Sequence, residues 1–259
     1  MYATERRQFI EQVLRDDQRI VAADIARRLD VTTETVRRDL AALEQAGVLR
    51  RVYGGAVSAE RGSLAESDLR DRVAQHSTAK RAIAARALDA LGERFTGSIM
   101  LDAGTTTGAL VELLPPRLVG SSAEVVTHAP ALASELAGSA GVSLTTIGGR
   151  VRGLTGAAVG SGAVAAIERL RPDVAFIGAN GISADFGLST PDPAEAEVKR
   201  AIAESARRAV ALVDSSKFGA ETLVQFARLD AIDLLVTDSE PDGRLAAALA
   251  ASGTEVWIA

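Results

Sequence analysis

The sequence contains no cysteine among its 259 residues, and it is poor in histidine and in aromatic residues. Without cysteine there are no disulfides, no thiolate metal ligands and no cysteine nucleophile, a composition that suits a reducing compartment. Only two histidines are present, His76 and His128, and they lie far apart in sequence. We therefore expect neither a metal site nor a cofactor.

Long hydrophobic runs are missing as well. No apolar stretch reaches the roughly 18 residues that a membrane helix needs. The N-terminal residues MYATERRQFIEQ are charged from Glu5 onward and lack the apolar stretch of a secretory signal. Hydrophobic residues still make up 47% of the chain, enough to offset the entropic cost of ordering it. We expect a soluble, cytoplasmic protein with one large or two modest domains.

Charge is distributed unevenly along the chain. Residues 1–59 carry ten arginines and nine acidic residues, although the whole chain has a net charge of −5. Eight of these arginines form adjacent pairs: Arg6-Arg7, Arg27-Arg28, Arg37-Arg38 and Arg50-Arg51. One pair on a helix usually marks a solvated face. Four pairs within one short segment favour a polyanionic partner.

The first segment has the pattern of three short helices and a hairpin. Thr4 is a plausible cap for a first helix, residues 24–29 suit a second, and Thr32 can cap a third over 33–45. Gly47 follows as a stop signal, and residues 48–57 alternate around a glycine pair, as in a two-stranded wing. We therefore predict a winged helix-turn-helix domain over residues 1–57, followed by a linker over 58–75.

Residues 76–259 alternate between strand and helix patterns. Helical stretches occur at 79–91, 108–114, 194–208 and 244–251. Short continuous apolar runs lie at 99–101, 125–127, 144–147, 174–177, 210–213, 234–237 and 256–258. Continuous runs indicate strands that are buried on both faces. We therefore predict a larger α/β domain with a mostly parallel sheet covered by helices, interrupted by an irregular glycine-rich stretch at 148–162.

The third predicted helix has the side chains of a DNA-reading helix. Its polar residues point away from the apolar stripe of Val36, Leu40 and Leu43. Residues near the start of such a helix read base edges in the major groove, and arginine suits guanine or phosphate. The candidate DNA contacts are Thr32, Thr33, Thr35, Arg37 and Arg38 on the helix, and Arg50, Arg51 and Tyr53 on the hairpin. The alternative is a dimerisation module whose arginines are only solvated.

The run from Asp102 to Thr107 is the clearest ligand-binding candidate in the larger domain. There a predicted strand ends in Asp-Ala-Gly-Thr-Thr-Thr and a helix begins. This order presents backbone N–H groups, hydroxyls and a helix N-terminus to an anion, most naturally a phosphate. No lysine follows a glycine here, so the run is not a Walker A motif. A capped turn without a ligand is the alternative.

Other polar groups follow predicted strands and are expected at the same edge of the sheet. Their mixture of three cations with glycine-rich loops suits a phosphorylated, hydroxyl-bearing ligand such as a sugar phosphate. Glu195 and Lys199 are equally consistent with an exposed i, i+4 pair, and Asp214 and Lys217 with a simple turn. The candidates are Asp102, Gly104, Thr105, Thr106, Thr107, Gly148, Gly149, Arg150, Gly178, Asn180, Gly181, Glu195, Lys199, Asp214 and Lys217.

These segments together resemble the DeoR family of bacterial transcription regulators. The run VTTETVRRDLAALEQAGVLRRVYGGAV, with ERRQFI upstream, is similar to the family's helix-turn-helix and wing. DAGTTT, IGGRV, GANGI, EAEVK and DSSKFG are similar to the ordered motifs of its sensor domain. Thr32 and Tyr53 replace the family's usual Ser and His, and the loop LGERFTG departs from the family's shorter turn.

The resemblance implies a recognition helix over Thr33–Gln45 with Arg37 and Arg38 as its main cations. It also implies a sensor fold similar to sugar-phosphate isomerases and CoA transferases. We expect a homo-oligomeric repressor, dimeric or tetrameric, of a carbohydrate catabolic operon. A phosphorylated sugar would then alter its affinity for double-stranded operator DNA.

The fold similarity leaves two other functions to weigh. A sugar-phosphate isomerase needs a general base to move a proton between carbons. Asn180 stands where related isomerases place an aspartate, and an amide cannot act as that base. This substitution favours binding without turnover. A scaffold that binds neither DNA nor a ligand is the remaining alternative.

Overall fold

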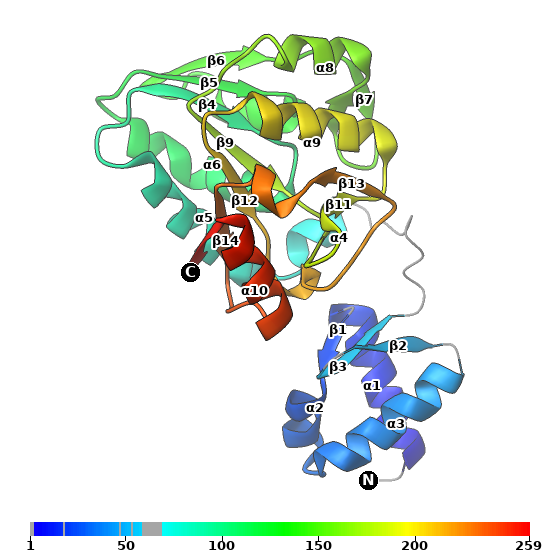
Figure 1. Cartoon of the computed structure of the whole chain (residues 1–259). Helices are drawn as coiled ribbons and strands as arrows, with labels where there is room; N and C mark the ends of the chain where they lie inside the picture. The colour runs from blue at the N-terminus through cyan, green and yellow to red at the C-terminus, as the bar shows by residue number, and fades with distance from the viewer. Residues whose placement is uncertain (1–2, 18, 47, 53, 59–68) are drawn as a thin grey trace. The chain divides into compact units, whose positions relative to one another are not determined.

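The computed structural model describes residues 3–17, 19–46, 48–52, 54–58 and 69–259 (Figure 1). The chain divides into two compact units, residues 1–65 and residues 66–259. The first unit contains a helix-turn-helix with a wing, and the second is an α/β domain. The predicted fold class is therefore confirmed.

The N-terminal unit packs three helices against a small sheet. Its apolar core includes Ile10, Ile25, Val36, Leu40 and Leu49, all buried. The third helix has the predicted bounds, and the Thr32 hydroxyl caps it by accepting the N–H of Thr35 at 3.2 Å. The elements are α1 (Ala3–Asp17), β1 (Arg19–Val21), α2 (Ala22–Leu29), α3 (Thr33–Gln45), β2 (Leu49–Val52) and β3 (Gly55–Ser58).

The wing has one more strand than the sequence predicted. Strand β1 pairs antiparallel with β3, which also pairs with β2, so the sheet has three strands. Gly55 permits this pairing, because a Cβ at that position would lie 1.8 Å from the carbonyl oxygen of Ile20. Two further expectations need correction: α2 begins at Ala22, and Thr4 lies inside α1 rather than capping it. The predicted stop at Gly47 lies outside the described residues.

A buried carboxylate joins α1 to α3. Asp39 accepts hydrogen bonds from Arg6 Nε at 2.8 Å and from Arg7 Nε at 3.4 Å. The side chain of Asp39 is only 4% exposed, and that of Arg6 is only 14% exposed. The first arginine pair therefore joins the two helices, and α3 is held by charge as well as by its apolar stripe.

The second unit is built on a seven-stranded sheet in which every neighbouring pair is parallel. Each of the seven apolar runs predicted from the sequence corresponds to one of its strands. The strands are β4 (Gly97–Leu101), β5 (Ala123–Thr127), β6 (Val142–Thr146), β9 (Val174–Gly178), β12 (Ala209–Leu212), β14 (Leu234–Thr237) and β15 (Glu255–Ile258). Their order across the sheet is β15-β14-β12-β9-β4-β5-β6.

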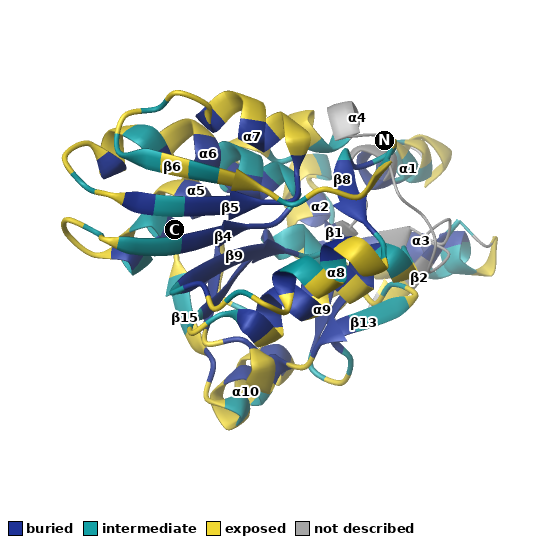
Figure 2. Ribbon diagram, turned by 90° about the horizontal axis from the view of Figure 1, so that it is seen from above, coloured by how far each residue is buried: buried dark blue, intermediate teal, exposed yellow. Residues whose placement is uncertain are grey.

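Helices cover both faces of this sheet (Figure 2). Side chains alternate between the faces: Phe176 packs in the cluster under one helical layer, and its neighbour Ile177 packs in the other. One layer contains α5 (Ser77–Ala87), α6 (Thr105–Leu118) and α7 (Pro130–Leu136). The other contains α8 (Ser161–Ile167), α9 (Pro193–Ser205) and α10 (Gly243–Ser252). Burial on both faces explains the continuous apolar runs.

Smaller elements surround the sheet. The glycine-rich stretch contains a hairpin of β7 (Arg150–Arg152) and β8 (Ala157–Val159), and a second small sheet contains β10 (Gly181–Ser183), β11 (Gly187–Thr190) and β13 (Val224–Ala227). Short 3-10 helices are η1 (Leu88–Leu91), η2 (Ser215–Lys217) and η3 (Leu229–Ala231). Helix α4 (Leu69–Ala74) lies within the segment that we expected to be a linker.

The strand order creates a crevice between β4 and β9. From β4 the chain proceeds outward through β5 and β6, whereas from β9 it proceeds the other way through β12, β14 and β15. The helices that follow β4 and β9, α6 and α9, lie on opposite faces. Ligands of open α/β sheets bind beyond the carboxyl ends of strands at such a point.

We predict that Asp39→Asn loosens the N-terminal domain, because the substitution removes the ion pairs that join α1 to α3. Amide hydrogen exchange of α1 and α3 should report a loss of about 1–3 kcal/mol in the free energy of opening. Glu34→Gln is the matched control on the same helix, since its contact with Arg37 is long, at 3.8 Å, and exposed. Equal effects of the two substitutions would contradict a structural role for Asp39.

Candidate functional site

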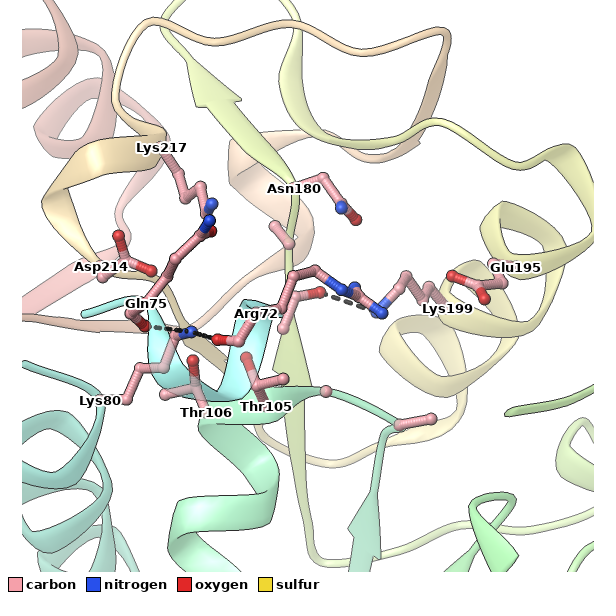
Figure 3. Close-up of a pocket in the computed structure, with 14 residues that line it drawn as sticks. Arg72, Gln75, Lys80, Thr105, Thr106, Asn180, Glu195, Lys199, Asp214 and Lys217 are labelled. Carbon is pink, nitrogen blue, oxygen red and sulfur yellow. Dashed lines mark hydrogen bonds between the residues drawn. The ribbon is translucent and has the colours of Figure 1, made fainter. Parts of the chain in front are cut away.

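A pocket lies at the carboxyl ends of β4 and β9 (Figure 3). Its cavity volume is about 50 Å³. Four basic and two acidic side chains line it, together with backbone and hydroxyl groups. The lining residues are Arg72, Gln75, Lys80, Ala103, Gly104, Thr105, Thr106, Gly178, Ala179, Asn180, Glu195, Lys199, Asp214 and Lys217.

The N-terminus of α6 opens into this pocket. Gly104 occupies the N-cap position, and no side chain caps the helix there. The first N–H groups of a 14-residue helix therefore face the pocket beside Thr105 and Thr106. A helix N-terminus carries partial positive charge, so this end of the pocket favours an anion.

Asp102 is fully buried directly behind the pocket. Its carboxylate accepts hydrogen bonds from the ammonium of Lys199 and, at 3.0 Å, from the backbone N–H of Gly178, and it lies 3.2 Å from Nε2 of His128. Burial by itself would raise the pKa of Asp102, but Lys199 and His128 outweigh burial and hold it well below its usual value. Asp102 thus ties together β4, β9 and α9, and it does not line the pocket.

Glu195 and Lys199 do not form the i, i+4 ion pair that the sequence allowed. Among the described residues, Lys199 bonds to Asp102 and to the carbonyl of Gly178, at 2.9 Å for the latter. Glu195 instead accepts hydrogen bonds from Arg152 Nη1, at 3.2 Å, and from the Thr155 hydroxyl. Both side chains are therefore fixed at the pocket wall by partners from other elements.

The remaining polar groups come from the segments that follow β9 and β12. Asn180 Oδ1 accepts the hydroxyl of Thr190 at 3.1 Å, which leaves its NH₂ group as a donor. Asp214 caps η2 by accepting the N–H of Ser216 at 3.2 Å. Burial acts to raise the pKa of Asp214, but Lys217 and Ser216 lower it below its usual value. Asp214 is therefore ionised beside Lys217 at neutral pH.

Several predicted site residues lie outside the pocket. Gly148, Gly149 and Arg150 are exposed and do not line it, because the loop follows β6, an edge strand separated from β4 by β5. Thr107 is buried within α6. Gly181 is packed in β10, where a Cβ would lie 2.3 Å from the carbonyl oxygen of Ala220.

Sequence reasoning missed three lining residues, Arg72, Gln75 and Lys80. Lys80 Nζ donates to the backbone carbonyls of Arg72 and, at 2.7 Å, of Gln75. Burial and the nearby cations lower the pKa of Lys80 to about 8, against the attraction of Asp214. One signal could have identified it: Lys80 is in helical phase with the buried residues Ile83, Ala84 and Ala87.

The candidate DNA-contacting residues differ in their exposure and in the bonds that they make within their own domain. Thr32 caps α3, and Thr33 is exposed at the start of that helix. Arg37 and Arg38 are exposed, and Arg38 makes no ion pair with any described residue. Arg51 Nε bonds to Glu44 at 2.6 Å and, with its N–H group, lowers the pKa of Glu44. The side chain of Arg50 and all of Tyr53 lie outside the described residues.

Comparisons with known proteins identify both units. A family model of the DeoR-like helix-turn-helix domain matches residues 6–62, and one of the DeoR C terminal sensor domain matches residues 75–239. The chain belongs to the DeoR family. It is therefore a transcriptional regulator with a DNA-binding domain and a sensor domain, not an enzyme, as the sequence predicted.

Curated relatives span nearly the same length. The chain is 37% identical to the transcriptional regulator GlpR of Haloferax volcanii over 93% of this chain and 91% of the relative. It is 28% identical to the glycerol-3-phosphate regulon repressor of Escherichia coli K12, over 93% of each chain. A solved ribose 5-phosphate isomerase from Methanocaldococcus jannaschii is 17% identical with a TM-score of 0.39, covering 54% of this chain and 53% of that one, too distant to add to the fold described above.

The described part of the chain carries neither a membrane-spanning helix nor a cluster of metal ligands. None of its helices has the length and apolarity to cross a membrane. The same residues contain no group of three or more His, Cys, Asp or Glu side chains arranged to hold a metal ion.

We predict that Asp102→Asn strongly destabilises the sensor domain, because it leaves the buried ammonium of Lys199 without a carboxylate. The cost in urea unfolding at pH 7 should be about 3–5 kcal/mol. Asp102→Asn combined with Lys199→Met should recover part of that loss. Asp185→Asn is the control, since the Asp185 side chain is 64% exposed in its ion pair with Arg244. A double variant no more stable than the single one would argue against the pairing.

Proposed function

We propose that this regulator represses a carbohydrate catabolic operon. We further propose that a phosphorylated sugar, bound in the pocket at the carboxyl ends of β4 and β9, changes its affinity for operator DNA. The observation that supports this proposal most directly is the uncapped N-terminus of α6 facing a cavity lined by four cations. Such an environment favours a phosphate over a neutral sugar.

The pocket also offers groups suited to the rest of a sugar phosphate. The phosphate would accept hydrogen bonds from the N–H groups of Thr105 and Thr106, from the Thr106 hydroxyl and from Lys217. Asn180 and the carboxylate of Glu195, on the wall formed by β9 and α9, would bind sugar hydroxyls. The name of the E. coli relative, a glycerol-3-phosphate regulon repressor, is consistent with a phosphorylated effector.

The side chains of the pocket support binding without turnover. A general base must be able to reach the proton that it abstracts. Asp102 is enclosed by Lys199, Gly178 and His128, and Glu195 is held by Arg152 and Thr155. Asn180 has no basic group. Because the carboxylates are already hydrogen-bonded and the amide is not basic, the pocket favours a sensor over a sugar-phosphate isomerase.

In the DNA-binding domain, α3 is the proposed recognition helix. Its exposed N-terminal half carries Thr33, Arg37 and Arg38, while its other face is anchored by the apolar core and Asp39. One small winged domain makes few phosphate contacts, so we propose that a dimer or tetramer binds repeated or palindromic half-sites. Coupling between effector and operator is expected to be about 1–3 kcal/mol.

The effector site is tested by thermal shift with glycerol 3-phosphate, ribose 5-phosphate and fructose 6-phosphate, each against its unphosphorylated counterpart. A ligand at 100 times its Kd stabilises the protein by about 2.7 kcal/mol. Thr106→Ala and Lys217→Ala should abolish most of this stabilisation while leaving operator binding intact. Arg244→Ala is the matched control on an exposed ion pair. Stabilisation by the unphosphorylated sugars alone, or unchanged binding in both pocket variants, would refute the assignment.

Operator recognition is tested with Arg37→Ala and Arg38→Ala on DNA selected from a random pool by the wild-type protein. Each substitution should abolish the footprint and leave effector affinity unchanged, because α3 belongs to the other unit. Arg27→Ala controls for the general loss of an exposed arginine, since Arg27 is paired with Asp24 on α2. A footprint retained by both α3 variants would count against the recognition helix.

A further inference from the structure

All the lysines of this protein line the pocket. The sequence has 29 basic residues, and only Lys80, Lys199 and Lys217 among them are lysine, the rest being arginine. A guanidinium stays charged in proteins, whereas a buried ammonium can lose its proton. The pocket therefore contains every basic side chain of the protein, histidine apart, that can exist in either a charged or a neutral form.

Lys80 and Lys199 are both buried but differ in the groups that accept their hydrogen bonds. Lys199 is paired with the carboxylate of Asp102, which supplies a full negative charge. Lys80 Nζ donates instead to two backbone carbonyls, that of Arg72 and, at 2.7 Å, that of Gln75 (Figure 3). Within the described part of the chain, the hydrogen bonds of the Lys80 ammonium thus go to uncharged groups.

The charges around Lys80 are mainly positive. Lys217 from η2 and Arg72 from α4 repel its ammonium, and Asp214, which follows β12, attracts it. Asp214 also interacts with Lys217 and His76. Burial, together with Lys217 and Arg72, lowers the pKa of Lys80 to about 8. The other described ionisable groups of the pocket and of the first turn of α5 are Glu195, Lys199 and Arg81, the last bonded to Glu112 of α6 at 3.0 Å.

The hydrogen bonds of Lys80 suit both of its protonation states. An ammonium has three N–H groups, and a neutral amine has two N–H groups and a lone pair. The carbonyls of Arg72 and Gln75 accept two N–H groups in either state. In the charged state a third N–H group remains for an anion in the pocket, whereas in the neutral state a lone pair takes its place and repels an anion.

We propose that Lys80 binds the phosphate of the effector and takes up a proton as the effector enters. This inference rests on the proposed function and adds a pH dependence to the same site. Lys80 and Thr106, at the N-terminus of α6, line one pocket, so a dianionic phosphate bound there would favour the charged ammonium.

The sign of the pH dependence follows from linkage. The unliganded sensor loses the proton of Lys80 as the pH rises through about 8, the pKa of that group. The liganded sensor keeps the proton to higher pH, because the phosphate raises this pKa. Binding therefore takes up a proton in this range, and the affinity for the effector falls as the pH rises.

The first test observes the amine directly by NMR. Full-length protein labelled with ¹³C at lysine Cε has three labelled groups, and the signal missing from Lys80→Arg is that of Lys80. In unliganded protein this signal should titrate with a midpoint of about 8. Saturating inorganic phosphate should raise the midpoint by about one pH unit or more. An ordinary midpoint of about 10.4 in unliganded protein, or a midpoint that phosphate leaves unchanged, would overturn the inference.

Arg81→Lys is the matched control for this titration. It adds a fourth signal from the same helix, at a position where the arginine side chain is 71% exposed. The midpoint of this lysine should stay near the ordinary value of about 10.4 with and without phosphate. An equal response at positions 80 and 81 would show a general effect of charge and would also overturn the inference.

The second test counts protons by calorimetry, with inorganic phosphate as the probe. Titrations at pH 8.5 in two buffers of different ionisation enthalpy should show that the wild type takes up about half a proton or more per bound phosphate. Its affinity should fall about fourfold or more between pH 7.5 and 9. Lys80→Arg should bind phosphate without this uptake, because a guanidinium is charged throughout this range.

The outcomes separate the two proposals. If neither phosphate nor the sugar phosphates bind to the wild type at pH 7, the proposed function and this inference both fail. If phosphate binds without proton uptake and with an affinity that is constant from pH 7.5 to 9, only this inference fails. Uptake that persists in Lys80→Arg would assign the proton to another group and would likewise overturn it. If Lys80→Arg does not fold, the midpoint and the proton count of the wild type still decide.

Discussion

The buried carboxylate of Asp102 is the constraint on which the sensor domain depends. An ionised group without water is costly unless it is paired and hydrogen-bonded. Asp102 meets this requirement by drawing in Lys199 from α9, the N–H of Gly178 at the end of β9, and His128 after β5. Strands β4 and β9 are thereby held together, and the start of α6 is oriented toward the space between them. The pocket at this edge therefore owes its geometry to the way a charge is stabilised inside the core.

The DNA-binding domain is also stabilised by a buried carboxylate that is paired with cationic side chains. Asp39 is a buried residue of α3 and is paired with Arg6 and Arg7 of α1. Arginines in this domain consequently divide into two roles. Arg6, Arg7 and Arg51 hydrogen-bond to carboxylates of their own domain, whereas Arg37 makes only a 3.8 Å contact with Glu34 and Arg38 pairs with no described carboxylate. An abundance of arginine therefore overstates the number of cations available to DNA, and the position of each on its helix decides its role.

Much of the fold could be predicted because burial leaves a simple pattern. Strands covered on both faces read as short apolar runs, and all seven strands of the main sheet were visible in this way. Helix α3 was predicted to the residue because Thr32 signals its start. Strand β1 was missed because three residues carry no periodicity, and α4 because six residues of mixed charge resemble a linker.

The pocket was harder to predict than the sheet. Polar groups after β4, β9 and β12 meet because parallel strands end at one edge, so Thr106, Asn180 and Lys217 were found from the sequence. Arg150 was misplaced because sequence order does not give spatial order: β6, which precedes it, is an outer strand. Arg72 and Lys80 were missed because they precede every strand of the sheet and reach the pocket only through tertiary packing.

The pairing of β4 with β9 also has a consequence for biosynthesis. The bond from the N–H of Gly178 to Asp102 joins residues that are 76 positions apart, and such distant pairings form slowly. The N-terminal unit completes its own core within its first 65 residues. Domains fold as units while the ribosome extends the chain. The DNA-binding domain should therefore fold well before the sensor domain. A nascent chain would thus complete its DNA-binding domain before the domain that senses the effector.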